Sequence, residues 1–189
     1  YHTDAYSNLA ELLRESSKFE EAMFYILNAI KIKPNNHILY NNLAKIYIAL
    51  GNLKEAEISL LEAIKINPNY PIALNNLGEV LRELNRLKDA EVYIRKAISI
   101  KPDYCVAYNN LGKLAIIFDR LDEAMDLAKK AIDLNPDYAD SYLTMGKIYV
   151  ELGEPKIALL FYKKFLEIRP SSVFGYFRLN NISLIKSSS

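Results

Sequence analysis

The stretch A-Y-N-N-L-G-K-L, residues 107–114, places two neighbouring asparagines inside a segment whose apolar residues have helical spacing. Asparagine is a poor residue for a helix interior, because its short amide competes for nearby backbone groups. The pair nevertheless recurs as L-Y-N-N-L-A at residues 39–44 and as A-L-N-N-L-G at residues 73–78. A feature that weakens a helix and still returns at a fixed interval has either an architectural or a functional role.

The interval is 34 residues, and it runs through nearly the whole chain. Prolines mark it at Pro34, Pro68, Pro102, Pro136 and Pro170. Alanines keep the same spacing at Ala22, Ala56, Ala90, Ala124 and Ala158. The sequence therefore divides into five tandem units, residues 3–36, 37–70, 71–104, 105–138 and 139–172, and residues 173–189 form a partial sixth unit or a C-terminal capping helix.

Each unit is predicted to contain two helices, because its apolar residues follow the spacing of three and four. Residue types that mostly tolerate a left-handed helix end lie between the two helices: Ser17, Gly51, Asn85, Asp119 and Gly153. The residue after each boundary proline is predicted to cap the next helix: Asn35, Asn69, Asp103, Asp137 and Ser171.

Small residues recur in the first helix of every unit, at Ala10, Ala44, Gly78, Gly112 and Gly146. They are predicted to face the recurring alanines of the second helix, where a close crossing leaves no room for a larger side chain. One hairpin cannot bury its remaining apolar face alone, so the next must stack on it. The pattern predicts an all-α solenoid.

Composition narrows the classes of partner. Lys and Arg number 24 and Asp and Glu 23, so the net charge of +1 disfavours a nucleic-acid binder or a membrane-surface protein. No run of about 18 apolar residues suggests a membrane span. The single Cys105 excludes an intrachain disulfide and favours a reducing, cytoplasmic location. The chain opens without methionine, so we expect a mature or excised segment.

An enzyme is not expected from this sequence. Only His2 and His37 are present, no Cys/His cluster has metal-ligand spacing, and no glycine-rich loop precedes a helix. Paired carboxylates such as Glu20 and Glu21 belong to a solvated helix face. We therefore predict no catalytic residue, no metal and no cofactor.

Three motifs recur every 34 residues: Y-N-N-L-G, then E-A, then A-I-x-x-x-P. Through these motifs, the repeat resembles the tetratricopeptide repeat family over residues 3–172. The resemblance is greatest to the repeat region of O-linked N-acetylglucosamine transferases. It implies a right-handed superhelix whose first helices line a concave inner wall. The pentatricopeptide family, which binds RNA, is disfavoured because its unit is typically longer and its groove more basic.

The helix face left over by the core residues includes the fifth and sixth places of each unit, so we expect both asparagines of each pair on the inner wall. The family's chaperone-tail clamp needs a lysine at the fifth place, which holds Ser7, Asn41, Asn75, Asn109 and Leu143. In O-linked N-acetylglucosamine transferases and in the peroxisomal import receptor, asparagines near the sixth place hold the backbone of an extended peptide. That place holds Asn8, Asn42, Asn76 and Asn110, and Thr144 breaks the row.

The resemblance therefore implies a peptide-binding row, with charged neighbours on the same wall supplying specificity. Its candidate residues are Asn8, Asn41, Asn42, Asn75, Asn76, Asn109, Asn110, Lys45, Glu79, Arg82 and Lys113. The alternative is that the amides only satisfy local backbone groups or water. Substitution by alanine separates the two, because a clear loss of stability favours the structural role.

Three functions remain open. The first is a protein-interaction scaffold that binds an extended peptide or a partner segment in its groove. The second is the repeat region of a larger glycosyl- or sulfo-transferase whose catalytic domain lies elsewhere. The third is a self-associating module, because the segment from Val173 to Ile185 is apolar on more than one helix face.

Overall fold

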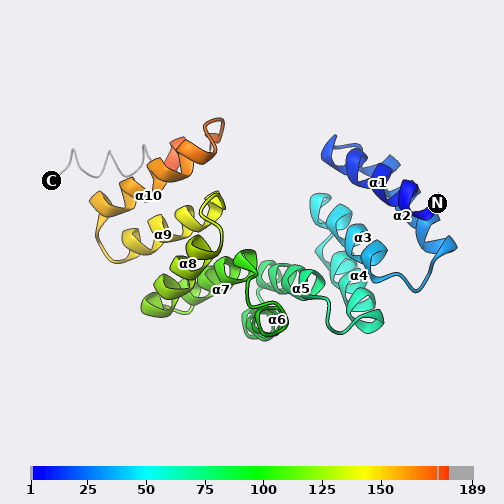
Figure 1. Cartoon of the computed structure of the whole chain (residues 1–189), viewed down its shortest axis with the longest axis horizontal. Helices are drawn as coiled ribbons and strands as arrows, with labels where there is room; N and C mark the ends of the chain where they lie inside the picture. The colour runs from blue at the N-terminus through cyan, green and yellow to red at the C-terminus, as the bar shows by residue number, and fades with distance from the viewer. Residues whose placement is uncertain (1, 174, 179–189) are drawn as a thin grey trace. The chain divides into compact units, whose positions relative to one another are not determined.

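The computed structural model describes residues 2–173 and 175–178, and within them it is all-helical, without strands (Figure 1). The described residues fall into two compact units, divided between Lys101 and Pro102. Unit 1 contains α1 (His2–Glu15), α2 (Phe19–Ile32), α3 (His37–Ala49), α4 (Leu53–Ile66), α5 (Pro71–Glu83) and α6 (Leu87–Ile100). Unit 2 contains α7 (Cys105–Ile117), α8 (Leu121–Leu134), α9 (Ala139–Glu151) and α10 (Pro155–Ile168).

Consecutive helices form antiparallel hairpins, and the predicted left-handed turns are confirmed. The φ angles are 59° at Ser17, 61° at Asn85 and 58° at Asp119. Both turn glycines, Gly51 and Gly153, have φ of 75°, where a Cβ would be strained. The residue after each of these five turns donates its N–H to a carbonyl five residues back, at 2.8 to 2.9 Å, which satisfies an otherwise unpaired helix-end carbonyl.

The predicted helix caps are wrong by one residue, and at three boundaries the cap makes no side-chain bond. The N-cap is the second residue after the proline, and Asn36 Oδ1 there accepts the N–H of Ile38 at 3.0 Å. At the next three boundaries the N-cap is Tyr70, Tyr104 or Tyr138, which makes no side-chain cap bond. A phenol is too long and rigid to reach back to the first turn of its own helix.

The helix pairs cross closely, as the small residues predict. In unit 1, a Cβ added to Gly78 would lie 2.3 Å from Cγ1 of Ile94. In unit 2, a Cβ on Gly146 would lie 2.3 Å from Cε1 of Tyr162. Gly112 is different, because the nearest atom to its added Cβ is 3.5 Å away. The second helix of one hairpin packs on the first helix of the next, α2 on α3 and α4 on α5 in unit 1, and α8 on α9 in unit 2.

The described residues after α10 are helical at 173 and 175–178. Gly175 packs against Phe165 and Leu166 of α10, while Val173 and Phe177 are exposed. Most of the apolar segment on which we base self-association lies outside the described residues, so that hypothesis stays a prediction. Within the described part, no helix is long and apolar enough to cross a membrane.

Candidate peptide-binding row

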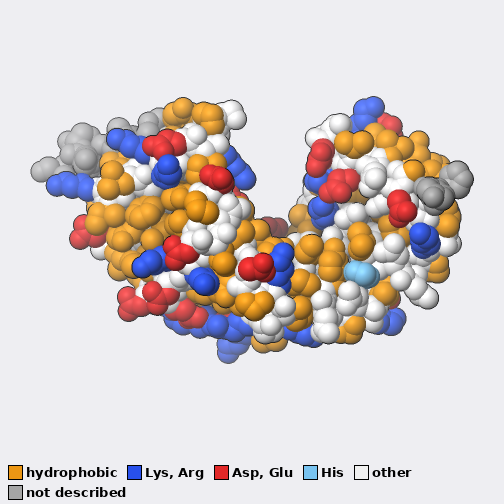
Figure 2. Space-filling model, viewed as in Figure 1, with side chains coloured by type: hydrophobic (Ala, Val, Ile, Leu, Met, Phe, Trp, Pro, Cys, Tyr) orange, Lys and Arg blue, Asp and Glu red, His pale blue; other side chains and the backbone are white. Residues whose placement is uncertain are grey.

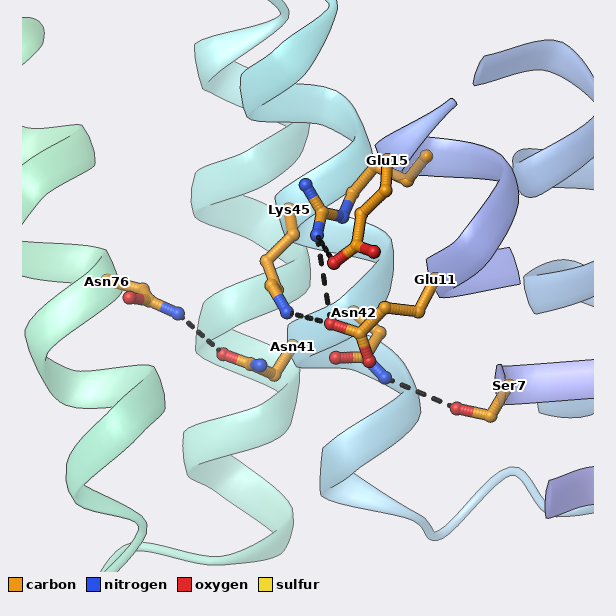
Figure 3. Close-up of polar contacts among 8 residues, drawn as sticks. Ser7, Glu11, Glu15, Asn41, Asn42, Lys45 and Asn76 are labelled. Carbon is orange, nitrogen blue, oxygen red and sulfur yellow. Dashed lines mark hydrogen bonds and ion pairs between the residues drawn. The ribbon is translucent and has the colours of Figure 1, made fainter. Parts of the chain in front are cut away.

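Polar side chains of the first helices are joined from one repeat to the next in unit 1 (Figure 3). Asn42 of α3 donates its Nδ2–H to Oγ of Ser7 on α1, at 3.2 Å. Asn76 of α5 donates in the same way to Oδ1 of Asn41 on α3, at 2.9 Å. A sixth-place amide thus bonds the fifth-place side chain of the preceding repeat, 35 residues earlier in sequence.

The fifth-place asparagines do not line an open wall, which corrects the expectation from the sequence. Asn41, Asn75 and Asn109 are 3%, 2% and 0% exposed. Asn41 and Asn109 each accept a hydrogen bond from the first helix of the next repeat, a contact that the helical pattern of one repeat does not contain. These three buried amides therefore serve packing and are not accessible to a ligand.

The sixth-place amides keep hydrogen-bonding capacity after they have bonded the neighbouring repeat. An asparagine amide has two N–H donors and a carbonyl oxygen with two lone pairs. The contacts of Asn42 and Asn76 described above each use one donor, and both side chains are only partly buried. Asn8 begins the row and is exposed, with no hydrogen-bond partner among the described residues. Asn8, Asn42 and Asn76 are therefore the accessible part of the predicted row in unit 1.

Charged side chains flank these amides and pair with one another. Lys45 Nζ lies 2.5 Å from Oε1 of Glu11, which joins α3 to α1 (Figure 3), and Arg82 Nε lies 3.3 Å from Oε1 of Glu79 within α5. The hydrogen bond from Lys45, helped by the charges of Lys45 and Arg14, lowers the pKa of Glu11 against the opposing effect of burial. The charged side chains beside the row therefore include both signs.

Unit 2 carries the same inter-repeat bond with a different donor. Thr144 of α9 donates its hydroxyl hydrogen toward Oδ1 of Asn109 on α7, at 2.7 Å, and lies 3.2 Å from the carbonyl of Asp140. Thr144 interrupts the row of asparagines, as its residue type implies, yet it keeps the bond between repeats. Asn110 is buried and accepts a hydrogen bond from Lys113 Nζ at 3.2 Å. The predicted site residues of unit 2 are therefore less accessible than those of unit 1.

Two members of these rows were not among the sequence candidates, Ser7 and Glu11. Their signal is present in the sequence, as a polar residue at the fifth or ninth place of one unit and its partner 35 or 34 residues later. It is missed when each repeat is considered alone.

No group of three or more His, Cys, Asp or Glu side chains in the described part of the chain could hold a metal ion. Basic and acidic side chains intermingle over the visible face (Figure 2).

Comparison with known proteins gives one family. Models described as tetratricopeptide repeat match residues 3–36, 35–103, 106–138 and 127–159. No curated protein sequence matches the chain.

Among solved structures, TTC0263, a thermophilic TPR protein of Thermus thermophilus, superposes with a TM-score of 0.86 at 21% identity, covering 96% of this chain and 99% of that one. PilF of Pseudomonas aeruginosa gives 0.82 at 20% identity, covering 98% and 85%. YrrB, a TPR protein with an unusual peptide-binding site, gives 0.63 at 23% identity, covering 91% and 89%. At these identities the similarity shows the fold alone.

Proposed function

Because this chain belongs to the tetratricopeptide repeat family, we propose that it is a protein-interaction scaffold that binds an extended peptide segment along α1, α3 and α5 of unit 1. The resemblance to O-linked N-acetylglucosamine transferases extends to the repeat alone, since the neighbours described above are other repeat proteins. The amides of Asn8, Asn42 and Asn76 are proposed to contact the ligand backbone.

The observation that carries this proposal is the state of the Asn42 and Asn76 amides. Each is fixed by a bond to the preceding repeat, yet is only partly buried and retains an acceptor oxygen. A fixed side chain loses little rotamer freedom when a ligand binds, so its hydrogen bond contributes more net free energy. The inter-repeat bond therefore supports a binding role for these amides.

The spacing of the amides suits an extended ligand. Packed helices lie about 8–10 Å apart, and an extended chain rises about 3.3 Å per residue. Neighbouring amides would therefore contact about every third ligand residue. Each contact contributes about 1 kcal/mol net, so three contacts give weak binding and side-chain contacts must supply the rest.

The ligand is expected to carry apolar as well as charged side chains. Ile38 and Ile72 lie at the second place of their repeats and are exposed large apolar residues. Lys45 on α3 and Glu79 and Arg82 on α5 supply charges of both signs on the same two helices. A segment of mixed character is therefore a better match than a strongly acidic or basic one.

The proposal can be tested with peptides selected from a random displayed library against the chain, then synthesised and titrated by fluorescence anisotropy. Asn8→Ala is the clean variant, because Asn8 is exposed and has no partner in the described part of the chain. We expect it to raise the Kd about fivefold, the loss of about 1 kcal/mol, without lowering the unfolding midpoint.

Lys88→Ala, on the exposed face of α6, is the matched control and should leave the Kd unchanged. Adding Asn42→Ala to Asn8→Ala should weaken binding further. Selected peptides that bind the double variant as tightly as the original chain would contradict the proposal.

A further inference from the structure

The second repeat contains a hollow on the side of α3 away from the asparagine row. Its cavity volume is about 260 Å³, and it is lined by Tyr40, Leu43 and Tyr47 of α3 and by Glu55, Ile58, Ser59 and Glu62 of α4. A helix turns about 100° per residue, so Asn42 lies about 200° around α3 from Tyr40. The hollow is therefore separate from the proposed peptide-binding row.

A missing side chain explains the hollow. Ser59 occupies the twenty-third place of its repeat, and the other four repeats hold larger residues there: Tyr25, Tyr93, Leu127 and Phe161. The hydroxyl of Ser59 lies 2.9 Å from the carbonyl oxygen of Glu55, four residues earlier, so it bonds back to its own helix. Nothing of Ser59 extends into the space that a ring fills in other repeats.

The fifth repeat shows the filled form of the same place. It has tyrosines at the two equivalent positions of its first helix, Tyr142 and Tyr149. The ring of Phe161 stacks on Tyr149, with centroids 5.3 Å apart and planes 10° apart. In the first repeat, Tyr25 lies against Tyr6 with centroids 5.8 Å apart. The second repeat thus keeps the two tyrosines, Tyr40 and Tyr47, and has Ser59 where the fifth repeat has the ring of Phe161.

The rim of the hollow is apolar on one side and acidic around it. Ile58 is 63% exposed and forms the apolar edge of the hollow, as Leu160 does at the same place of the fifth repeat with 65% exposure. Glu55 makes no ion pair among the described residues, and Glu62 pairs with the exposed Lys65 at 3.2 Å. A basic group beside an apolar ligand would therefore find an unneutralised carboxylate at Glu55.

We propose that this hollow binds an aromatic side chain from a segment of a partner protein, which stacks on Tyr47 as Phe161 stacks on Tyr149. A lysine or arginine next to that aromatic residue pairs with Glu55. The volume is below the roughly 300 Å³ at which small-molecule pockets begin, so it fits one side chain rather than a whole small molecule. The partner is thus a peptide segment with an aromatic residue beside a basic one.

The test is an NMR titration of the full chain with N-acetyl-phenylalanyl-arginine amide. We expect chemical-shift changes at the backbone amides of Tyr47, Ile58 and Ser59. N-acetyl-alanyl-arginine amide lacks the ring and N-acetyl-phenylalanyl-glutamate amide reverses the charge, so both should bind at least about tenfold more weakly. Changes of equal size with the alanine peptide would overturn the proposal.

Ser59→Phe rebuilds the arrangement of the fifth repeat and should abolish the response to the arginine peptide while raising the unfolding midpoint. Ser59→Leu copies the fourth repeat and provides a second filled variant. Glu55→Gln should weaken the arginine peptide about threefold and leave the midpoint unchanged. An undiminished response in both filled variants would refute the proposal. Asn8→Ala should not alter this binding, so failure here and failure of the peptide-binding row are distinguishable.

Discussion

The polar row of the first helices has the same connectivity in the two units but differs in accessibility. In unit 1 the donors Asn42 and Asn76 are partly buried, and Asn8 is exposed. In unit 2 the donor Thr144 is buried and Asn109 is completely buried, with its Nδ2 lacking a hydrogen-bond partner among the described residues. Burial therefore decides whether a repeated polar residue can also face a ligand or serves the packing alone.

The packing around the row differs as well. Thr144 lies beside Gly112, whose added Cβ would be 3.7 Å from the Thr144 methyl carbon, an ordinary contact distance. Gly146, two residues beyond Thr144, has no such room against Tyr162. In unit 2, the helix crossing at Gly112 therefore has room for a methyl group and the crossing at Gly146 does not. Substitution by alanine should raise the free energy of unfolding at Gly112 and lower it at Gly146.

The largest expected effect on stability is at Gly146, where the helix crossing leaves no room for a methyl group. Gly146→Ala should lower the free energy of unfolding by about 3 kcal/mol, because the buried ring of Tyr162 cannot move away without opening the core. Urea denaturation followed by circular dichroism measures the change. Gly112→Ala is the control and should raise stability by about 0.5–1 kcal/mol, since alanine is the better helix residue where space allows. Equal shifts for both variants would contradict this account of the crossings.

The next largest effect is expected when the hydroxyl group of Thr144, which bonds Asn109, is replaced by a methyl group of similar shape. Thr144→Val should cost about 2 kcal/mol, because it leaves Oδ1 of the completely buried Asn109 without the donor seen here. Thr144→Ser keeps the hydroxyl and should lose less than half as much. Unfolding midpoints in urea give both values. If valine were tolerated as well as serine, the bond would not stabilise unit 2.

The sequence predicts the repeated elements well because they depend on local rules. The left-handed turns at Asn85 and Asp119 follow from residue type, and the close crossing at Gly78 follows from its size. The predicted caps fail because residue type does not separate Asn35 from its neighbour Asn36, which is the N-cap, and because at the next boundary the N-cap is Tyr70 rather than Asn69.

The site is less predictable because it depends on how closely neighbouring repeats approach. A helical wheel sets Asn41 and Asn42 about 100° apart and does not show that Asn41 lies against Asn76 of the next first helix, where it is buried. The role of Thr144 is hidden for the same reason, since its residue type suggests an interruption of the row. Ser59 is informative only when the same place is compared across all repeats.

A smaller effect is expected for the exposed end of the row in unit 1. Ser7→Ala removes the acceptor of Asn42, but both side chains are partly open to water, which replaces the lost partner. The unfolding free energy should fall by only about 0.5 kcal/mol. Comparison with Thr144→Val tests the role of burial directly. A loss at Ser7 as large as at Thr144 would show that burial does not set the strength of these bonds.

The smallest effect concerns the ion pair that joins α1 to α3. Because Lys45 lowers the pKa of Glu11 in the folded state, this carboxylate stabilises unit 1 at pH values above its unfolded pKa of about 4.3, and the contribution is lost as the pH falls through the lowered folded pKa. Both side chains are over 30% exposed, so the amount is below about 1 kcal/mol and should shrink in high salt. Urea midpoints measured from about pH 3 to pH 7 should therefore fall less steeply below pH 4.3 in Glu11→Gln than in the original chain. Lys45→Met should flatten the same part of the profile, and an unchanged slope in both variants would show that the Glu11 carboxylate is not the titrating group.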